Sequence, residues 1–394
     1  MSEVTEQLLH DEHHAVRETA RKFAVEVVQP GAAARDEKEE FPSALVRQMA
    51  ELGFLGLPFP EEYGGAGLDT LAYCIAVEEI ARVDASLAIT LAAHVSLGCG
   101  PIYQFGTEAQ KRKYLVPLAQ GKHLGAFGLT EPNAGSDAGG TQTTAVREDG
   151  GFRVNGSKLY ITNGSEAGTV VFTARTDKSQ GTRGISSFIV EKGTTGFRAG
   201  KRENKMGLRS SDTVPLEFEN VFIPGDQLLG ELGRGFKQFL VTLAGGRISI
   251  GALSLGIAQG AYDAAVRYAM ERKQFGKPIA EFQAIQFMLA DMGVKIQAAR
   301  HLVYDAAWRK DNDLPYNTEG AMAKLFASEA STWCADKAIQ IHGGMGYMRE
   351  MHVERYFRDA KLMEIGEGTS EIQRIVIARN LLKDAGYNWE GDRE

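Results

Sequence analysis

One carboxylate stands between two glycines near the end of the chain. It belongs to Glu367, with Gly366 before it and Gly368 after it. Flanking glycines let the backbone take unusual angles and leave room for a ligand, as a general base needs when its substrate must lie directly against it. A glutamate near a helix N-terminus can equally be a solvated residue whose charge suits the helix dipole. This segment by itself leaves both interpretations open.

A helix is predicted to begin near Ser370, directly after this carboxylate. Ser370 and Gln373 have the spacing of a capping box, and apolar residues follow at helical intervals. Those apolar residues are Ile372, Ile375, Val376 and Leu381. Glu367 is therefore expected in the loop that precedes the helix.

Two glycine-containing segments could contact a phosphate or a cofactor. Small and hydroxyl residues from Gly128 to Asp137 expose backbone N–H groups, as a loop against a phosphate or flavin edge would, although a plain β-turn has the same composition. The run from Gln340 to Tyr347 is either a glycine C-cap or a backbone platform for a phosphate. It is not a dinucleotide fingerprint, because no strand precedes it and no helix opens on its glycines.

The other candidate side chains carry weaker signals. Arg272 to Gly276 places cationic and amide donors at a helix end, where most arginines only favour the helix C-terminus. The N-terminal histidines lack the His-Glu-x-x-His order, so no metal site is expected. No serine or cysteine occupies a nucleophile elbow, and His342 and Tyr347 are expected to be core or surface residues rather than reagents.

Composition indicates an ordinary globular protein. With 394 residues, of which 43% are apolar, the chain can bury a large core and form two or three domains. A net charge of −7 leaves no basic footprint for nucleic acid or an anionic membrane. Cys74, Cys99 and Cys334 are far apart and odd in number, which favours buried thiols in a reducing compartment over a disulfide framework.

Two further features point to a cytoplasmic location. No uninterrupted apolar run is expected to span a bilayer. The N-terminus begins Met1, Ser2, Glu3 and is too acidic for a signal or transit peptide. We therefore predict a cytoplasmic protein without membrane insertion.

The elements that position these residues fall into three successive regions, an α+β organisation. Residues 1–122 show helical periodicity, and residues 236–394 form longer helical pieces typical of an antiparallel four-helix bundle. Residues 123–235 change to short alternating runs typical of a β domain. Within that domain, hairpin turns are predicted at Asn155-Gly156 and Asn163-Gly164, with strands over 169–173, 187–190 and 214–222.

The helical pieces of the last region have readable boundaries. A helix from Arg247 to Lys273 is expected to stop before Gly276 and Pro278, and a break is expected around Pro315. Between them, five apolar residues recur at core spacing. These are Ile285, Met288, Leu289, Met292 and Ile296.

Taken together and in order, these segments resemble the acyl-CoA dehydrogenase family of flavoproteins over nearly the whole chain. One long motif runs from Gly128 to Gly140, and another from Gln340 through Gly343 and Gly344 to Asp359, with Glu367 following at the family's spacing. The resemblance implies an α-helical N-terminal domain, a β-barrel-like middle domain and a C-terminal four-helix bundle. It also implies a homotetramer, built as a dimer of dimers, with one FAD in each subunit.

The resemblance assigns roles to residues in each region. The flavin is expected between the middle and C-terminal domains, with some contacts supplied by the neighbouring subunit. Contacts from the middle domain are Phe127, Leu129, Thr130, Ser136, Tyr160, Ile161 and Thr162; those from the neighbouring subunit are Arg272, Gln274, Phe275, Gln283, Gln340, Gly343 and Gly344; Thr369 and Glu371 complete the set. The expected substrate contacts are Ser136, Arg247, Gly366 and Gly368.

The implied reaction explains the need for Glu367. A carboxylate in water removes an α-proton poorly, so the site must raise the basicity of Glu367 by desolvation and polarise the thioester carbonyl. In the family, the carbonyl is held by a backbone N–H at the catalytic glutamate and a flavin hydroxyl, while the β-hydrogen leaves as hydride to flavin N5. The product is a trans-2-enoyl-CoA, and the electrons pass to an electron-transferring flavoprotein.

Several positions depart from the family pattern. Gly246 stands where the isovaleryl branch places its base, which leaves Glu367 as the base, and Ala244 stands where relatives often carry Asp. Tyr160 replaces a common Trp beside the flavin, and Gly366 replaces a bulky Tyr, which opens space for a branched or wider acyl chain. Ala88 occupies the region where glutaryl-specific members carry an arginine, so an uncharged acyl tail is expected.

Three other functions remain in competition. An acyl-CoA oxidase or a flavin monooxygenase could use the same scaffold, although a monooxygenase has no use for an α-proton base. A non-catalytic acyl-CoA-binding scaffold would purify without colour. Chain length, branching, pathway and electron acceptor stay open.

Overall fold

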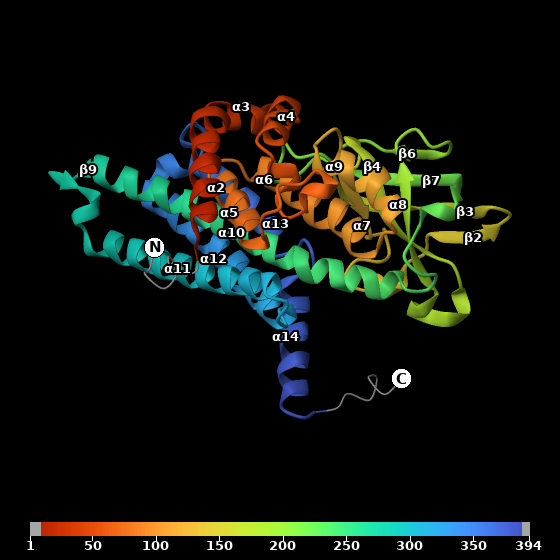
Figure 1. Cartoon of the computed structure of the whole chain (residues 1–394). Coiled ribbons are helices and arrows are strands. Elements are labelled where there is room, and N and C mark those ends of the chain that lie inside the picture. Colours follow the sequence, from red (N-terminus) through yellow and green to blue (C-terminus); the bar gives the residue numbers. More distant parts are fainter. Residues whose placement is uncertain (1–8, 388–394) are drawn as a thin grey trace. The chain divides into compact units, whose positions relative to one another are not determined.

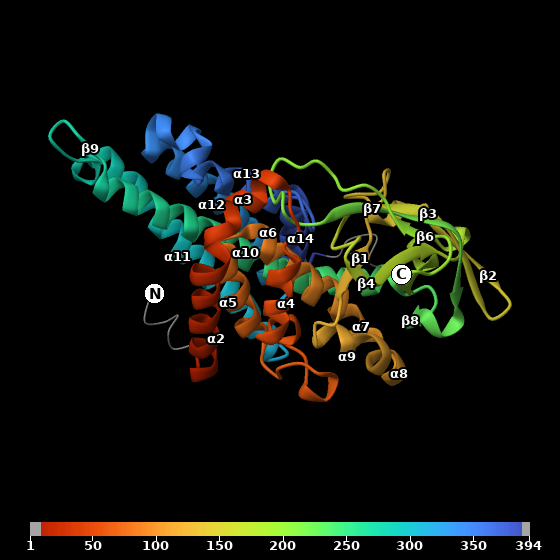
Figure 2. The ribbon, with the colours of Figure 1, turned by 90° about the horizontal axis from the view of Figure 1, so that it is seen from above.

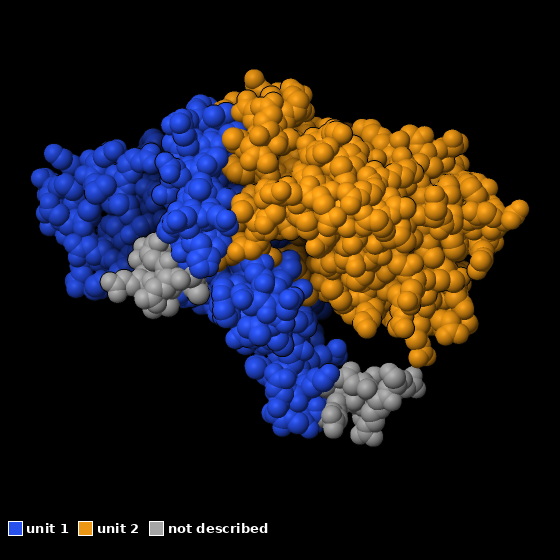
Figure 3. Space-filling view, viewed as in Figure 1, with its two compact units in different colours: residues 1–30, 74–85, 247–394 blue, residues 31–73, 86–246 orange. Residues whose placement is uncertain are grey.

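The computed structural model describes residues 9–387 of the chain. The chain forms two compact units, which Figure 3 shows in separate colours. Unit 1 consists of Met1–Pro30, Cys74–Ala85 and Arg247–Glu394, and unit 2 of Gly31–Tyr73 and Ser86–Gly246. The three predicted domain boundaries stay a prediction, whereas the order helical, β, helical along the chain is observed.

Unit 1 is helical and contains the long helices of the C-terminal region. α10, α11 and α12 run alongside one another in both ribbon views (Figures 1 and 2). The helices are α2 (Asp11–Lys22), most of α5 (Thr70–Ala81), most of α10 (Gly235–Glu271), α11 (Gln283–Asp311), α12 (Asn317–His342), α13 (Val353–Met363) and α14 (Ser370–Asp384). A two-stranded hairpin, β9 (Lys273–Gln274) with β10 (Lys277–Pro278), joins α10 to α11.

The predicted helix ends are close to the observed ones, but the predicted start of the first long helix was wrong, because α10 begins at Gly235 rather than at Arg247. α10 ends at Glu271, just before Gly276, and α12 begins at Asn317, directly after the segment with Pro315. On α11, Met292 and Ile296 are buried as expected, but Ile285, Met288 and Leu289 are only half-buried, and Val294 is 69% exposed. The first half of α11 therefore has apolar side chains that its own chain does not cover.

Unit 2 combines short helices with an eight-stranded sheet. The strand order is β6-β7-β3-β2-β4-β5-β8, and β1 pairs in parallel with β4. The strands are β1 (Leu124–Gly128), β2 (Thr144–Glu148), β3 (Gly151–Thr162), β4 (Ala167–Arg175), β5 (Ile185–Glu191), β6 (Phe197–Ala199), β7 (Thr213–Pro224) and β8 (Leu228–Leu229). The helices are α3 (Gln29–Lys38), α4 (Ser43–Glu51), α6 (Ala85–Ala92), α7 (Gly100–Phe105), α8 (Glu108–Gln110) and α9 (Val116–Ala119).

The core of the sheet explains why these segments are strands. Phe172, Phe188 and Leu216 come from three different strands and are fully buried together with smaller apolar residues. Phe172 and Phe188 stack with ring centroids 5.7 Å apart. The three predicted strand segments lie within β4, β5 and β7.

The two predicted hairpin turns have different outcomes. Asn155 and Gly156 lie inside β3, where the pairing with β7 shifts between Val154 and Gly156, so they form a bulge rather than a turn. An added Cβ at Gly156 would lie 2.6 Å from Thr143 Oγ1, which explains the glycine. Asn163 and Gly164 do form a turn, but β3 and β4 are not neighbours in the sheet. β2 lies between them, so no hairpin forms.

Within residues 9–387, two helices are long and apolar enough to cross a membrane by length and composition, so the expectation that no apolar run has this length was wrong. They are Ala85–Phe105 and Gly235–Glu271. Their most apolar windows are 89% and 83% buried within the protein, as expected for core helices that need no lipid. The three cysteines are buried thiols, as predicted.

Candidate functional site

Glu367 lies in the short loop between α13 and α14, as the sequence predicts. The backbone N–H of Gly366 donates to Leu362 O at 2.8 Å, and the N–H of Ser370 donates to Glu364 O at 2.9 Å, so both ends of the loop are held by the chain itself. Glu367 and Gly368 have positive φ angles of 53° and 91°. A non-glycine residue rarely takes this conformation, so the loop holds Glu367 in a strained backbone geometry.

The cap of α14 differs from the prediction by one residue. Thr369, not Ser370, is the N-cap, and its hydroxyl accepts the N–H of Ile372 at 3.3 Å. Gln373 does not complete a capping box. Its side-chain amide donates instead to the carbonyls of Glu367 at 3.1 Å and Gly368 at 2.9 Å. The capping prediction was wrong because the loop itself uses the glutamine.

The backbone favours glycine at only one of the two positions beside Glu367. At Gly368 the φ angle of 91° favours glycine, and an added Cβ would lie 2.7 Å from Gln373 Nε2, so that side chain would have to move. At Gly366 the nearest atom to an added Cβ would be Leu362 O at 3.5 Å, an ordinary contact, and the φ angle is not positive. The fold therefore tolerates a side chain at position 366.

The carboxyl group of Glu367 has an unusual environment. Glu367 is partly buried, and its Oε2 atom has no hydrogen-bond partner within the described residues. Burial raises the pKa of Glu367 to about 7, although the charges of Lys324 and Arg247 act in the opposite direction. A carboxyl with this pKa can gain and lose a proton near neutral pH, as a general base must.

Two buried cations face this carboxyl group. Lys324 on α12 is fully buried, and its Nζ donates to Gly368 O at 2.7 Å. Burial lowers its pKa to about 8, and Glu367 is the strongest influence in the other direction. Arg247 on α10 is 5% exposed and donates to Asn317 Oδ1 at 2.8 Å, while its Nε has no partner within the described residues.

Lys324 was missed by the sequence reasoning. It lies in the apolar run from Ala321 to Ala327, on the side of α12 that also buries Ala323 and Ala327. A lysine at a core position of an amphipathic pattern is a readable signal, because a buried ammonium needs a compensating partner.

Unit 2 brings a second group of predicted residues together. Leu129 and Thr130 follow β1 and lie against β3, since Lys158 Nζ donates to Leu129 O at 3.2 Å and the N–H of Leu159 donates to Thr130 O at 2.8 Å. Tyr160, on β3, is 62% exposed and has a φ of 61°. Phe127 and Ile161 are buried, Thr162 is half-buried and Ser136 is exposed.

A buried ion pair supports this group and was also missed. Glu131 Oε1 accepts from Lys158 Nζ at 2.7 Å, with side-chain exposures of 2% and 0%. Glu131 also accepts the N–H groups of Gln142 and Thr143 at 2.6 and 3.2 Å, which closes the loop after β1. Burial favours a higher pKa for Glu131, but Lys158 and these donors outweigh it, so the pKa lies below its usual value. The loop from Gly128 to Asp137 is thus more than a plain turn.

The third group of predicted residues lies elsewhere in unit 1. Arg272, Gln274 and Phe275 occupy the hairpin between α10 and α11, at the tip of the unit and away from α14 in Figure 1. Tyr268 and His342 stack with ring centroids 4.2 Å apart, so the ends of α10 and α12 meet near the Gln340 segment.

This third group does not reach Glu367 within one chain. Gln340 lies sixteen residues beyond Lys324 on the same helix, about 24 Å at the helical rise. Phe275 is 93% exposed, and an added Cβ at Gly343 or Gly344 would meet nothing within 4 Å. An exposed aromatic ring and an open pair of glycines fit a large planar cofactor with phosphates. The residues of this third group therefore fit FAD, but they lie away from the Glu367 loop of the same chain.

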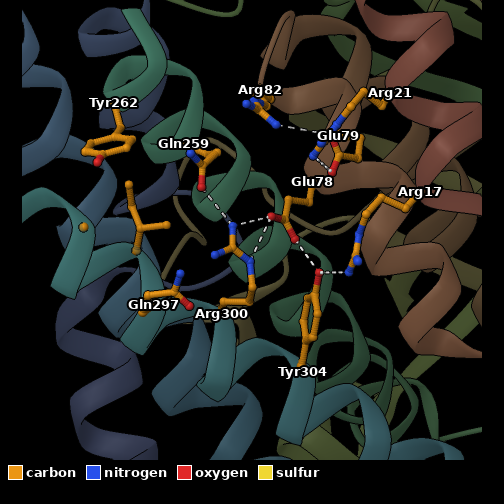
Figure 4. A pocket seen from close by; sticks show the side chains of 12 residues that line it. Arg17, Arg21, Glu78, Glu79, Arg82, Gln259, Tyr262, Gln297, Arg300 and Tyr304 are labelled. Carbon is orange, nitrogen blue, oxygen red and sulfur yellow. Dashed lines mark hydrogen bonds and ion pairs between the residues drawn. The ribbon is translucent and has the colours of Figure 1, made fainter. Parts of the chain in front are cut away.

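A separate charged pocket in unit 1 contains none of the predicted residues (Figure 4). Its volume is about 440 Å³. Arg300 donates to Glu78 Oε1 at 2.7 Å, Tyr304 donates to Glu78 Oε2 at 2.7 Å, and Arg21 donates to Glu79 at 2.6 Å. Because its carboxylates are engaged by arginines and a tyrosine, this pocket is a paired network that ties α2, α5 and α11 together.

Comparison with known protein families gives matches along most of the chain. The N-terminal, middle and C-terminal domains of acyl-CoA dehydrogenase match residues 10–122, 126–221 and 233–382, respectively. The curated protein "Probable acyl-CoA dehydrogenase YngJ" of Bacillus subtilis is 55% identical over 376 residues, covering 95% of this chain and 99% of that protein.

Solved structures give the same result. Butyryl-CoA dehydrogenase of Megasphaera elsdenii is 48% identical with a TM-score of 0.94, covering 95% of this chain and 99% of that one. A chain described under electron transferring flavoprotein of Acidaminococcus fermentans, in work on flavin-based electron bifurcation, is 52% identical with a TM-score of 0.95 and the same coverage. Other solved relatives are complexes with FAD.

Proposed function

The chain belongs to the acyl-CoA dehydrogenase family, and from that premise we propose that Glu367 is the base that removes the α-proton of a short-chain acyl-CoA. The observation that supports this role is the unpartnered Oε2 of Glu367, in a site where burial raises the pKa of the carboxyl to about 7. Position 246, where a related branch places its base, is a glycine in this chain, and Glu364, another carboxylate of the loop, pairs with Lys361 at 2.7 Å.

The chain's own residues act in the removal of the α-proton. Glu367 takes the proton from the α-carbon, and desolvation by the acyl chain increases its basicity further. The backbone N–H at Glu367 is the proposed donor to the thioester carbonyl, which becomes more negative as the proton leaves. FAD, when bound, supplies the acceptor for the hydride from the β-carbon.

The flavin site is proposed to be shared between subunits. Thr369 and Glu371 lie directly beside Glu367, whereas Gln340 lies about 24 Å from Lys324 along α12. That end of α12 meets the end of α10 that leads into the hairpin with Phe275. A neighbouring copy that presents its hairpin and its Gly343 segment would complete the site. The half-buried Ile285, Met288 and Leu289 on α11 are consistent with a covering subunit, as in the proposed homotetramer.

The acyl chain is proposed to be short and uncharged, with tolerance for branching. The Megasphaera elsdenii relative, a butyryl-CoA dehydrogenase, supports a short acyl chain. Ala88 is fully buried on α6 and offers no charge for a distal carboxylate. Gly366 is not required by the backbone, so we interpret it as space for a wider chain. Replacement by tyrosine is expected to lower kcat/KM for isobutyryl-CoA at least tenfold relative to butyryl-CoA.

The proposed electron acceptor is an electron-transferring flavoprotein. The relative from Acidaminococcus fermentans supports this assignment, since it is described with such a protein. The cytoplasm stays the predicted location.

The test is the anaerobic reduction of the bound flavin by butyryl-CoA, which is measured as the loss of the flavin's colour. The variant Glu367→Gln is expected to retain flavin and to lose at least about 10³-fold in the rate of reduction. Glu364→Gln is the matched control in the same loop, because Glu364 pairs with Lys361 at 2.7 Å and should leave the rate unchanged. Full activity of Glu367→Gln would contradict the proposal, and rapid oxygen consumption with acyl-CoA would identify an oxidase instead.

A further inference from the structure

Lys324 is a buried amine whose direct partner carries no charge. It is fully buried on α12, and its Nζ donates to the backbone carbonyl of Gly368 at 2.7 Å. A buried ammonium usually requires an anion, because a neutral acceptor does not compensate the loss of water. The nearest candidate is Glu367, the residue before that carbonyl, yet its Oε2 has no hydrogen-bond partner within the described residues.

The charged groups around Lys324 can be sorted by their own partners. Glu364 pairs with Lys361 at 2.7 Å, and Glu371 lies exposed at the start of α14. Arg247, which repels Lys324, donates to Asn317, and Tyr316 lies beside Arg247. Glu367 is therefore the carboxylate that interacts most strongly with Lys324, and Lys324 is the cation that acts most strongly on Glu367.

We propose that Lys324 is a positioning residue for Glu367. Its ammonium group anchors the carbonyl that follows the base, and its positive charge keeps the carboxylate ionised while leaving Oε2 without a direct partner. The inference rests on the proposed role of Glu367 as the base. A direct ion pair would also stabilise the carboxylate, but it would occupy the oxygen that must reach the substrate.

The loop offers a neutral counterpart that separates the two contributions. Gln373 is fully buried and donates to the same Gly368 carbonyl at 2.9 Å and to the Glu367 carbonyl at 3.1 Å. Gln373 therefore tethers the backbone of the loop without any charge. Loss of a tether alone should resemble loss of Gln373, whereas loss of the charge should change the ionisation of Glu367.

The experiment compares pH profiles of flavin reduction by butyryl-CoA in the purified holoenzyme. Lys324→Gln keeps a hydrogen-bond donor but has no charge. It is expected to move the acid limb of the profile, the pH range in which the rate falls as Glu367 becomes protonated, to higher pH by about one unit or more. Its rate should then fall at least about tenfold more at pH 6 than at pH 9. Lys324→Arg should restore much of the wild-type profile, and Gln373→Leu should lower the rate similarly at every pH without moving the acid limb.

A second measurement does not depend on catalysis. Difference infrared titration, with Glu367→Gln as the blank, follows protonation of the Glu367 carboxyl directly, and Lys324→Gln should raise its midpoint by the same amount. An unchanged midpoint and acid limb in Lys324→Gln would overturn the inference about Lys324 even if Glu367→Gln is inactive. An active Glu367→Gln enzyme would instead overturn the proposed function. If Lys324→Gln does not fold, Lys324→Met provides the same comparison of midpoints.

Discussion

Two lysines are fully buried within residues 9–387, Lys158 in unit 2 and Lys324 in unit 1, and they have opposite relations to their neighbouring glutamates. Lys158 donates directly to Glu131 Oε1 at 2.7 Å. Lys324 donates at the same distance to a backbone carbonyl, and Glu367 keeps one oxygen without a hydrogen-bond partner in the described part of the chain. Burial lowers the pKa of both lysines to about 8, and in each case a neighbouring glutamate acts in the opposite direction.

The difference shows how one pair of residue types serves structure in one place and chemistry in another. The pKa of Glu131 lies below its usual value because Lys158 and two backbone N–H groups satisfy it. The pKa of Glu367 is raised to about 7 because burial is not matched by direct partners. A satisfied carboxylate fixes a loop, whereas an unsatisfied one remains available to react.

Loss of the structural lysine should have the largest effect on stability. Lys158→Met leaves Glu131 buried without its cation and is expected to lower the free energy of unfolding by about 3–5 kcal/mol. Lys324→Met removes a donor to a carbonyl that Gln373 also serves, together with a charge that forms no direct ion pair with Glu367, and should cost about 1–2 kcal/mol. Urea denaturation of both variants measures the contrast. Equal losses of unfolding free energy would show that the two lysines contribute to stability in the same way.

The two glutamates should respond to pH with opposite signs. Because the folded pKa of Glu367 exceeds its ordinary value of 4.5, its stabilising contribution is present below pH 4.5 and is lost as pH rises to about 7. Glu367→Gln should therefore raise stability by about 2 kcal/mol at pH 8 and by little at pH 4.5. Glu131→Gln should lower stability at pH 8, and less so as pH falls, because the folded pKa of Glu131 is depressed.

Thermal unfolding of both variants between pH 4.5 and pH 8 checks this prediction. Parallel curves for the two variants would remove the distinction between a satisfied and an unsatisfied carboxylate.

The smallest effect is expected from the cap that holds the reactive loop. Thr369→Ala removes the hydroxyl that accepts the N–H of Ile372 and should cost about 1 kcal/mol of stability. Thr369→Ser keeps the hydroxyl and serves as the control. Denaturant midpoints measure the cost. If the loss of stability were well above 2 kcal/mol, the cap, rather than Lys324 and Gln373, would be the main contact that holds the loop in place.

Much of the fold was predictable because it depends on local patterns. Helical spacing located α11, α12 and α14, and alternating β-rich runs located β4, β5 and β7. The turn at Asn155-Gly156 failed because the signal for a tight turn is the same as the signal for a glycine bulge within a long strand. Only the neighbouring strand, which brings Thr143 close to Gly156, decides between them.

The candidate site was predictable in part for a different reason. Glu367 stands out because glycines flank it, and its place in the loop follows from the helix start. Lys324 and Glu131 did not stand out, because their partners are distant in sequence: Lys324 contacts Gly368, and Glu131 contacts Lys158. Contacts that form only on folding leave little trace in local spacing.

The exposed hairpin with Phe275 has a genetic consequence. Within one chain it lies far from Glu367, and in the proposed assembly it completes the flavin site of a neighbour. A chain with an altered hairpin and a chain with an altered Glu367 would then each carry what the other lacks. Expressed together, two such inactive alleles should complement each other and yield mixed assemblies in which a fraction of the sites is fully wild type.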